Sequence, residues 1–111
     1  MYWAHFRGLE SEKAVIHFYS KKKFKLLKQR LKTPFAEIDL LFRSPEGHLL
    51  MVEVKSANQS CFYSARISKR QMQRLGRAAS FLAARFNCLV EYHWAFVDQN
   101  YSVTVVEDVS L

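Results

Sequence analysis

The fold of this chain is decided by residues 36–55, AEIDLLFRSPEGHLLMVEVK. Two runs rich in β-forming residues flank the turn sequence SPEG at 44–47. This arrangement predicts a β-hairpin. Pro45 can begin a type I turn, and Gly47 can take the left-handed conformation that follows such a turn in a three-residue hairpin loop.

The turn also sets the register of the hairpin, because a three-residue loop pairs Ser44 with His48. In this register two pairs of charged residues lie across the ladder, Asp39 opposite Glu53 and Glu37 opposite Lys55. Side chains alternate along a strand, so all four are expected on one face of the hairpin. The other face carries apolar residues and is expected to be core: Ile38, Leu40 and Phe42 against Leu50, Val52 and Val54.

Two carboxylates directly across a ladder lie about 5 Å apart at Cβ and destabilise a sheet unless something neutralises them. A hard divalent cation such as Mg²⁺ or Mn²⁺ would do so, because it binds one or two carboxylates together with waters and phosphate oxygens. Lys55 points the same way as Glu53, so it could contact a phosphate or polarise a water. The alternative is a solvent-facing surface on which Glu37 pairs with Lys55 and the other acids are solvated.

Hydrophobic periodicity predicts the remaining elements on either side of the hairpin. Helices are expected at 9–22 and 66–86, and strands at 24–31, 36–43, 48–55, 89–97 and 101–106. The resulting fold class is α/β, a central mixed sheet of about five strands flanked by two main helices, in a single domain over 1–111. The second helix is expected to bury an apolar stripe made of Ile67, Leu75, Ala79, Phe81, Leu82 and Phe86.

The first helix is expected to carry Glu12 on the face that packs on the sheet, together with Val15, Ile16 and Tyr19. Its carboxylate should then point inward, near the strand acids. Ser11 is the expected N-cap, which leaves a second interpretation in which Glu12 only complements the helix dipole.

The chain has an excess of positive charge, with 17 Lys and Arg against 10 Asp and Glu and a formal net charge of +7. Such a basic chain is typical of nucleic-acid binders, and we expect DNA as the partner. The candidate DNA-binding residues come from two basic stretches and are Lys21, Lys22, Lys23, Arg66, Lys69, Arg70 and Arg74. No apolar run approaches the ~18 residues of a membrane span, and the first residues lack a secretory pattern, so we expect no membrane partner and a cytoplasmic location.

The hairpin acids resemble a known motif. Asp39 followed by Glu53-Val54-Lys55 resembles the D-x(n)-E-x-K core of the PD-(D/E)xK nuclease superfamily. More closely, EIDLL at 37–41 and MVEVK at 51–55 resemble the GEIDLI and FVEVK segments of the YraN-like family, small predicted endonucleases related to archaeal Holliday-junction resolvases. Gly8 and Glu12 fall where that family has Gly-x-x-x-Glu, so the resemblance covers about residues 8–86.

The resemblance implies a restriction-endonuclease-like core and a Mg²⁺-dependent (or Mn²⁺-dependent) endonuclease that cuts DNA, including branched or damaged DNA. It implies metal ligands at Glu12, Asp39, Glu53 and the backbone carbonyl of Val54, with Lys55 as the catalytic lysine. Gln71 stands where the family tends to carry a lysine that reaches the phosphate, and is a further catalytic candidate. The chain departs from the family pattern at Lys23, where the family has Gly after its first helix.

The sequence leaves two questions open, the function and the oligomeric state. The alternative function is a noncatalytic nucleic-acid-binding protein that keeps a nuclease scaffold. Cutting both arms of a four-way junction would call for a symmetric homodimer, for which the strand at 101–106 offers one surface.

Overall fold

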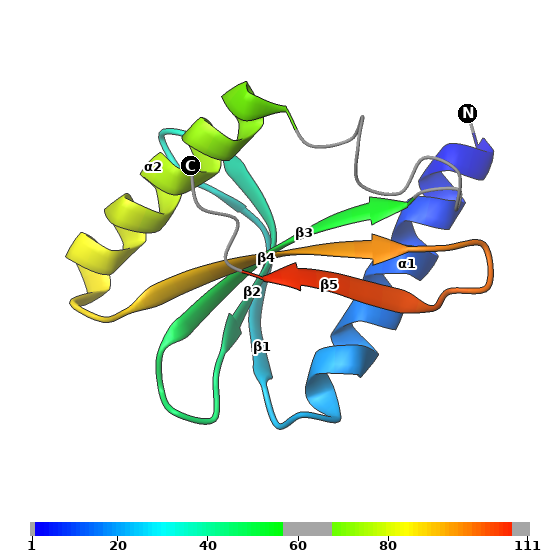
Figure 1. The fold of residues 1–111 in the computed structure, drawn as a ribbon, viewed down its shortest axis with the longest axis horizontal. Coiled ribbons are helices and arrows are strands. Elements are labelled where there is room, and N and C mark those ends of the chain that lie inside the picture. The colour runs from blue at the N-terminus through cyan, green and yellow to red at the C-terminus, as the bar shows by residue number, and fades with distance from the viewer. Residues whose placement is uncertain (1, 57–67, 108–111) are drawn as a thin grey trace.

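The computed structural model of the protein describes residues 2–56 and 68–107. The expected helices and strands occur in the expected order, apart from shifts at their ends (Figure 1). They are α1 (Tyr2–Ser20), β1 (Lys25–Lys32), β2 (Glu37–Arg43), β3 (Leu49–Ser56), α2 (Lys69–Phe86), β4 (Val90–Val97) and β5 (Val103–Glu107). Two residues named above, Arg66 and Ile67, lie outside the described residues.

The strands form one sheet of five in the order β1-β2-β3-β4-β5. Neighbouring strands are antiparallel except β3 and β4, which are parallel. A parallel pair needs a crossover connection, and α2 lies in the connection between these two strands. The prediction of an α/β fold with a five-stranded mixed sheet is therefore confirmed.

The two helices cover opposite faces of the sheet, and each face has its own core. Under α1 the buried side chains are Val15, Tyr19, Leu40, Phe42, Leu50, Val52, Ala95 and Val97. Under α2 they are Ile38, Leu41, Leu49, Met51, Leu75, Ala78, Leu82, Trp94 and Phe96. The prediction of a single apolar face on the hairpin was thus wrong, because β2 and β3 lie inside the sheet and are covered on both sides.

The predicted hairpin register is confirmed where the two strands pair. The ladder joins Leu40 to Val52 and runs to Arg43 and Leu49. At the turn, the Ser44 N–H donates to the His48 carbonyl at 2.8 Å. Gly47 has a φ of 94°, the left-handed conformation expected of it.

The N-cap prediction for Ser11 was wrong, because α1 begins at Tyr2 and Ser11 lies well inside it. Its side chain is fully buried, and its Oγ forms a 2.6 Å hydrogen bond with the Ser56 Oγ at the end of β3. Glu12 consequently stands inside the helix, so the helix-dipole interpretation loses its basis.

The apolar stripe of α2 is confirmed at Leu75 and Leu82, which are buried, but was wrong at Phe86, which is 57% exposed. Phe86 is the last residue of the helix, and Asn87 then leaves it with a left-handed φ of 51°. At the other end Ser68 is the N-cap, and its side chain accepts a hydrogen bond from the Gln71 N–H.

No helix in residues 2–56 or 68–107 combines the length and the apolar character that crossing a bilayer requires.

Lys23 ends α1 in a conformation that favours glycine. Its φ is 71°, its N–H donates to the Ser20 carbonyl, and the Phe24 N–H donates to the Tyr19 carbonyl. This is the hydrogen-bond pattern of a helix end closed by a left-handed residue.

Replacing Lys23 by glycine is expected to raise the free energy of unfolding by about 0.5–1 kcal/mol, because the strain of a side chain at positive φ is removed. Urea unfolding of Lys23→Gly beside Lys22→Gly measures it. Lys22 precedes the left-handed residue, so its replacement should bring no gain. Equal stability changes in the two variants would contradict the account of this helix end.

Candidate active site

Where β2 and β3 diverge, side-chain hydrogen bonds of Asp39 and Glu53 take the place of the backbone hydrogen bonds of the ladder. The described ladder ends at Leu40 and Val52. Beyond it the Asp39 N–H donates to the Glu53 Oε2 at 3.2 Å, and the Val54 N–H donates to the Asp39 Oδ2 at 2.9 Å. The two acids are therefore cross-strand neighbours, as predicted, and each carboxyl group satisfies a backbone donor of the opposite strand.

The predicted pairing of Glu37 with Lys55 was wrong. Glu37 pairs with Lys32 of β1 in the ladder, and it is exposed. No ion pair in the described part of the chain joins Glu37 to Lys55. The interpretation of these residues as an exposed cross-strand salt bridge loses its support.

The backbone is irregular at the same point of the sheet. Ile38 packs under α2 whereas Leu40 packs under α1, so the alternation of β2 breaks around Asp39. On the neighbouring strand, β1 pairs Gln29 with Leu40 and Leu31 with Ile38, and Arg30 between them has a φ of 52°. Such conformations are strained in a side-chain-bearing residue and are concentrated at functional sites.

Burial and mutual repulsion raise the pKa of both strand acids. Glu53 is only 8% exposed. Burial first, and then the charge of Asp39, raise its pKa to about 8. The pKa of Asp39 is also raised, chiefly by burial, although the Val54 N–H and a hydrogen bond from the Glu53 carboxyl group oppose this. Around neutral pH the metal-free Glu53 carboxyl group therefore keeps its proton.

Lys55 and Gln71 lie beside the acids. The Lys55 Nζ is 3.4 Å from the Gln71 Oε1, and it stands 5.8 Å from the centre of the buried Trp94 ring. The charge of Lys55 lowers the pKa of both Asp39 and Glu53, although burial outweighs it. The structure thus brings together four residues that the sequence singled out, from β2, β3 and the first turn of α2.

A small hollow of about 150 Å³ opens onto this group. Its lining comes from β2, β3 and α2 and consists of Ala36, Glu37, Glu53, Gln71, Arg74 and Leu75. Two acids, an amide and an arginine therefore share one opening, which suits a ligand that carries both a cation and a phosphate.

Glu12 lies near the pair without joining it. Its carboxylate accepts a 2.9 Å salt bridge from the Arg30 guanidinium. Burial raises the pKa of Glu12, Arg30 lowers it, and the charges of Asp39 and Glu37 raise it. The residues the structure describes contain no group of three or more acidic, His or Cys side chains positioned to hold a metal ion.

Asp39 and Glu53 alone nevertheless fit a divalent cation. They are two buried carboxyl groups that repel each other, and Mg²⁺ commonly binds to one or two protein carboxylates plus waters and substrate oxygens. Arg30 engages the Oε1 of Glu12 and offsets part of its charge, which makes Glu12 a weaker candidate ligand than the pair. The role of the Val54 carbonyl stays a prediction, since the contact described for this residue is through its N–H.

The raised pKa of Glu53 sets an expected pH dependence of stability. The folded state keeps the proton up to a pKa of about 8, whereas the unfolded chain releases it near 4.5. Between these values the folded state binds more protons, so stability falls as the pH rises. Without metal, the loss from pH 5 to pH 8.5 should be on the order of 2–4 kcal/mol, at about 1.4 kcal/mol per pKa unit.

Denaturant unfolding in EDTA across this pH range measures the loss, and Glu53→Gln should remove most of it. Glu46→Gln, in the exposed hairpin turn, is the control and should behave as the wild type does. A Glu53→Gln protein with an unaltered pH profile would contradict the assignment of the proton to Glu53.

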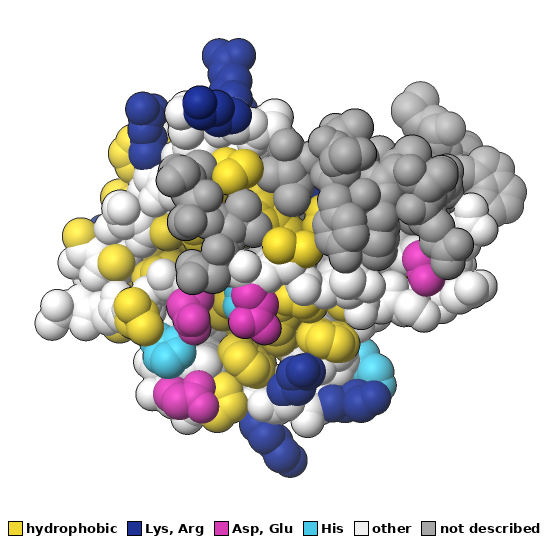
Figure 2. All heavy atoms as spheres, in the orientation of Figure 1, with side chains coloured by type: hydrophobic (Ala, Val, Ile, Leu, Met, Phe, Trp, Pro, Cys, Tyr) yellow, Lys and Arg dark blue, Asp and Glu magenta, His cyan; other side chains and the backbone are white. Residues whose placement is uncertain are grey.

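The basic candidates fall in two separate places. Lys69, Arg70 and Arg74 lie in the first half of α2, where Arg74 lines the hollow together with Glu53, whereas Lys21–Lys23 lie in the turn after α1. In Figure 2, Lys and Arg side chains gather at the top, where α2 begins, and again at the bottom, around the end of α1 and the start of β1. The structure therefore does not bring Lys21–Lys23 to the acidic pair.

Sequence reasoning missed two neighbours of the site. Arg30 was not among the predicted site residues, yet it holds Glu12 from a strained position. Trp94 lies under Lys55 although it comes from β4. Neither has a local sequence signal, because both depend on strand order.

Comparisons with known proteins give a family. The model of the family described as "Uncharacterised protein family UPF0102" matches residues 11–92, which include every acid discussed above. A UPF0102 protein of Parvibaculum lavamentivorans is 32% identical over 99 residues, 89% of this chain and 70% of that protein. One of Ruegeria sp. strain TM1040 is 38% identical over 76 residues, 68% of this chain and 60% of its own length.

Among solved structures, the chain resembles one described as "Structure of EndoMS-dsDNA2 complex" with a TM-score of 0.49 and 14% identity. The likeness covers 77% of this chain and 35% of that one, and at this level it carries no argument about function.

The matched family is the YraN-like family that the EIDLL and MVEVK segments resemble. Because its model covers most of the chain and a relative is 32% identical across 89% of it, the protein belongs to the UPF0102 family.

Proposed function

We propose that this protein is a metal-dependent endonuclease that hydrolyses phosphodiester bonds of DNA. The observation that carries the proposal is the buried Asp39–Glu53 pair with its raised pKa values, beside Lys55 and Gln71. Buried like charges cost stability in a scaffold, and perturbed carboxyl groups of this kind cluster at functional sites.

Asp39 and Glu53 would hold the cation, and the proton on Glu53 would leave as it binds. A bound Mg²⁺ or Mn²⁺ would neutralise phosphate charge and lower the pKa of a water. The backbone N–H groups of Asp39 and Val54 fix the orientation of the two carboxyl groups, so the ligand oxygens are held in place before the cation arrives.

Lys55 would act on the phosphate. Its ammonium group lies between the acids and Gln71, where it can stabilise the charge that develops on the phosphoryl oxygens during in-line attack. Gln71 would orient that ammonium group through its Oε1. As the first-turn residue whose N–H is capped by Ser68, it has a fixed place at the site.

The basic face of α2 would bring the DNA to this site. The helix carries Lys69, Arg70, Arg74, Arg77 and Arg85 and no acid. No salt bridge found within residues 2–56 and 68–107 engages these side chains, so they are available for phosphates.

The second candidate is a noncatalytic nucleic-acid binder, and incubation with end-labelled DNA separates the two. The panel contains duplex, flap, single-stranded and four-way junction DNA, each with Mg²⁺, Mn²⁺ or EDTA. The endonuclease account expects cleavage of at least one substrate with Mg²⁺ or Mn²⁺ and none with EDTA. Binding without cleavage under every condition would favour the scaffold account.

Neutralising Lys69 and Arg70 together is expected to weaken binding to all DNA sequences alike. Each lost phosphate contact should reduce the slope of log affinity against log salt by about 0.9 on duplex DNA. Anisotropy titrations at several salt concentrations measure the slope. Lys13→Gln, on α1 and paired with Glu10, is the control. A slope unchanged by Lys69→Gln/Arg70→Gln would place the DNA elsewhere.

The predicted homodimer and its contact through the last strand stay predictions. β5 is an edge strand of the sheet, so one of its sides lacks a neighbouring strand in the described structure.

A further inference from the structure

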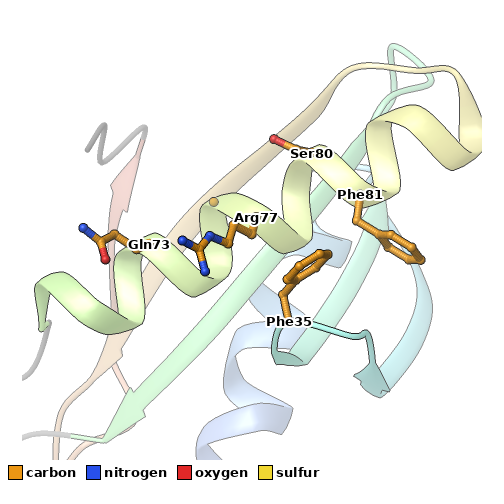
Figure 3. A pocket seen from close by; sticks show the side chains of 6 residues that line it. Phe35, Gln73, Arg77, Ser80 and Phe81 are labelled. Atoms are coloured by element: carbon orange, nitrogen blue, oxygen red, sulfur yellow. The ribbon is translucent and has the colours of Figure 1, made fainter.

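A second, larger hollow lies along α2 next to the acids. It has a volume of about 700 Å³ and is lined by Phe35, Gln73, Gly76, Arg77, Ser80 and Phe81. In Figure 3 the Phe35 side chain rises from its turn toward α2, and Arg77 and Phe81 lie on either side of it. We call this hollow the aromatic groove.

Phe35 is an exposed aromatic residue in a turn that several hydrogen bonds hold together. It is 42% exposed. Its turn is tied together by Thr33, whose Oγ1 donates to the Ala36 carbonyl at 2.6 Å and accepts from the N–H groups of Phe35 and Ala36. The turn therefore holds a partly exposed aromatic ring in a fixed place beside α2.

The ring of Phe81 meets that of Phe35 edge to face, with centres 6.1 Å apart and planes at 66°. In this arrangement one ring of the pair presents only its edge to the other, and both of its faces stay clear of that contact. An aromatic face of this kind can stack on a nucleobase, and such stacking does not depend on which base it is.

The polar lining of the groove suits an anion. Arg77 and Gln73 supply donors, and no lining residue is acidic. Arg77 has no salt-bridge partner among the residues described here. A nucleotide offers both a flat ring and a negative charge, so it matches the aromatic and the basic side chains of the groove.

The aromatic groove continues the smaller hollow beside Glu53. The same two segments of the chain, the turn before β2 and the helix α2, form the walls of both. Ala36 lines the hollow at the acids and Phe35, its chain neighbour, lines the groove. On the other wall Arg74 is followed by Arg77, three residues or about 4.5 Å further along the helix. This step is of the same order as one nucleotide, since successive phosphates of one strand are about 3.4 Å apart along the axis of B-DNA.

We propose that the aromatic groove binds an unpaired nucleotide adjacent to the scissile phosphate, with its base on Phe35 and Phe81 and its phosphate at Arg77. The inference rests on the proposed function and narrows the substrate. A base inside an intact duplex cannot reach such a groove without leaving the stack. The preferred DNA therefore carries unpaired nucleotides at a flap, a bulge or a single-stranded end.

The test measures binding of a fluorescent flap DNA and of the matched intact duplex, by anisotropy in EDTA. Asp39→Asn serves as the background protein, so that cleavage cannot interfere. Phe35→Leu keeps the apolar volume but removes the π face. It should weaken flap binding on the order of 10-fold, the loss of one stacked base, and leave duplex binding nearly unchanged. Phe35→Trp should restore flap binding.

Matched controls come from the far end of the same helix. Phe86→Leu changes another exposed aromatic residue, and Arg85→Gln another free arginine. Arg77→Gln should weaken flap binding more than Arg85→Gln does. Melting curves verify that each variant is folded, and Phe35→Tyr replaces Phe35→Leu if the latter is unstable, with flap binding then expected to be retained.

Equal effects of Phe35→Leu and Phe86→Leu on flap binding would overturn the inference, as would equal binding of flap and duplex by the background protein. If wild-type protein and Phe35→Leu cut every DNA at the same metal-dependent rate, the proposed function stands and the inference fails. If no DNA is bound in any condition, both fail, and the groove is then assigned to a ligand of another class.

Discussion

Replacing Asp39 by asparagine is expected to lower the rate of metal-dependent DNA cleavage on the order of 1,000-fold or more while leaving the fold intact. The loss follows because the cation would keep only one carboxylate of the buried pair. The fold should survive because the asparagine side chain keeps an oxygen that can accept the hydrogen bond from the Val54 N–H.

The free energy of unfolding of Asp39→Asn without metal should equal or exceed that of the wild type at pH 8. The substitution removes a charge that burial and Glu53 both oppose. Single-turnover cleavage beside denaturant unfolding measures the two effects, with Glu46→Gln as the matched control. Cleavage by Asp39→Asn at the wild-type rate would contradict the assignment of the site.

The second large effect is expected from replacing Lys55 by methionine, which should lower the cleavage rate about 100-fold. The ammonium group would act on charge that exists only in the transition state, so its loss should appear in the rate and far less in DNA affinity. The methionine keeps the apolar stem beside Trp94. The stability cost should therefore be about 1 kcal/mol or less, for one hydrogen bond to Gln71 and one cation–π contact.

Single-turnover rates, DNA affinity and melting curves of Lys55→Met beside Lys13→Met separate the roles of this residue. A small loss in rate together with a clear loss in stability would make Lys55 a structural residue, and would favour the noncatalytic binder. Because Lys55 also lowers the pKa of Asp39 and Glu53, metal affinity is measured in the same variant.

The hairpin could be predicted from sequence because its determinants are local. The turn residues 44–47 set the register, and the register alone placed Asp39 beside Glu53. Gln71 was singled out by the resemblance to the YraN-like family alone, and the structure places it in the first turn of α2, where its N–H donates to the Ser68 side chain.

The failures all depend on contacts between distant segments. Ser11 has the chemistry of an N-cap but meets Ser56, 45 residues away, inside a longer helix. The two-sided core of the hairpin follows from α1 and α2 covering opposite faces of the sheet, which no local pattern reports. The salt bridge from Arg30 to Glu12 needs a left-handed residue in a strand, a conformation that sequence propensity argues against.

Arg30 bears directly on the predicted third metal ligand. Because Arg30 already offsets part of the charge of Glu12, Glu12→Gln should change metal affinity much less than Asp39→Asn does. The reverse order of effects would make Glu12 a principal metal ligand.

The most direct test of the central claim is Mn²⁺ binding at pH 8 without DNA, measured by electron paramagnetic resonance on the wild type, Glu12→Gln, Asp39→Asn and Glu53→Gln. The account predicts that the wild type binds Mn²⁺ and that either change in the Asp39–Glu53 pair weakens binding at least about 10-fold. Equal Mn²⁺ affinity in the wild type, Asp39→Asn and Glu53→Gln would contradict it, because the buried pair would then have no part in holding a cation.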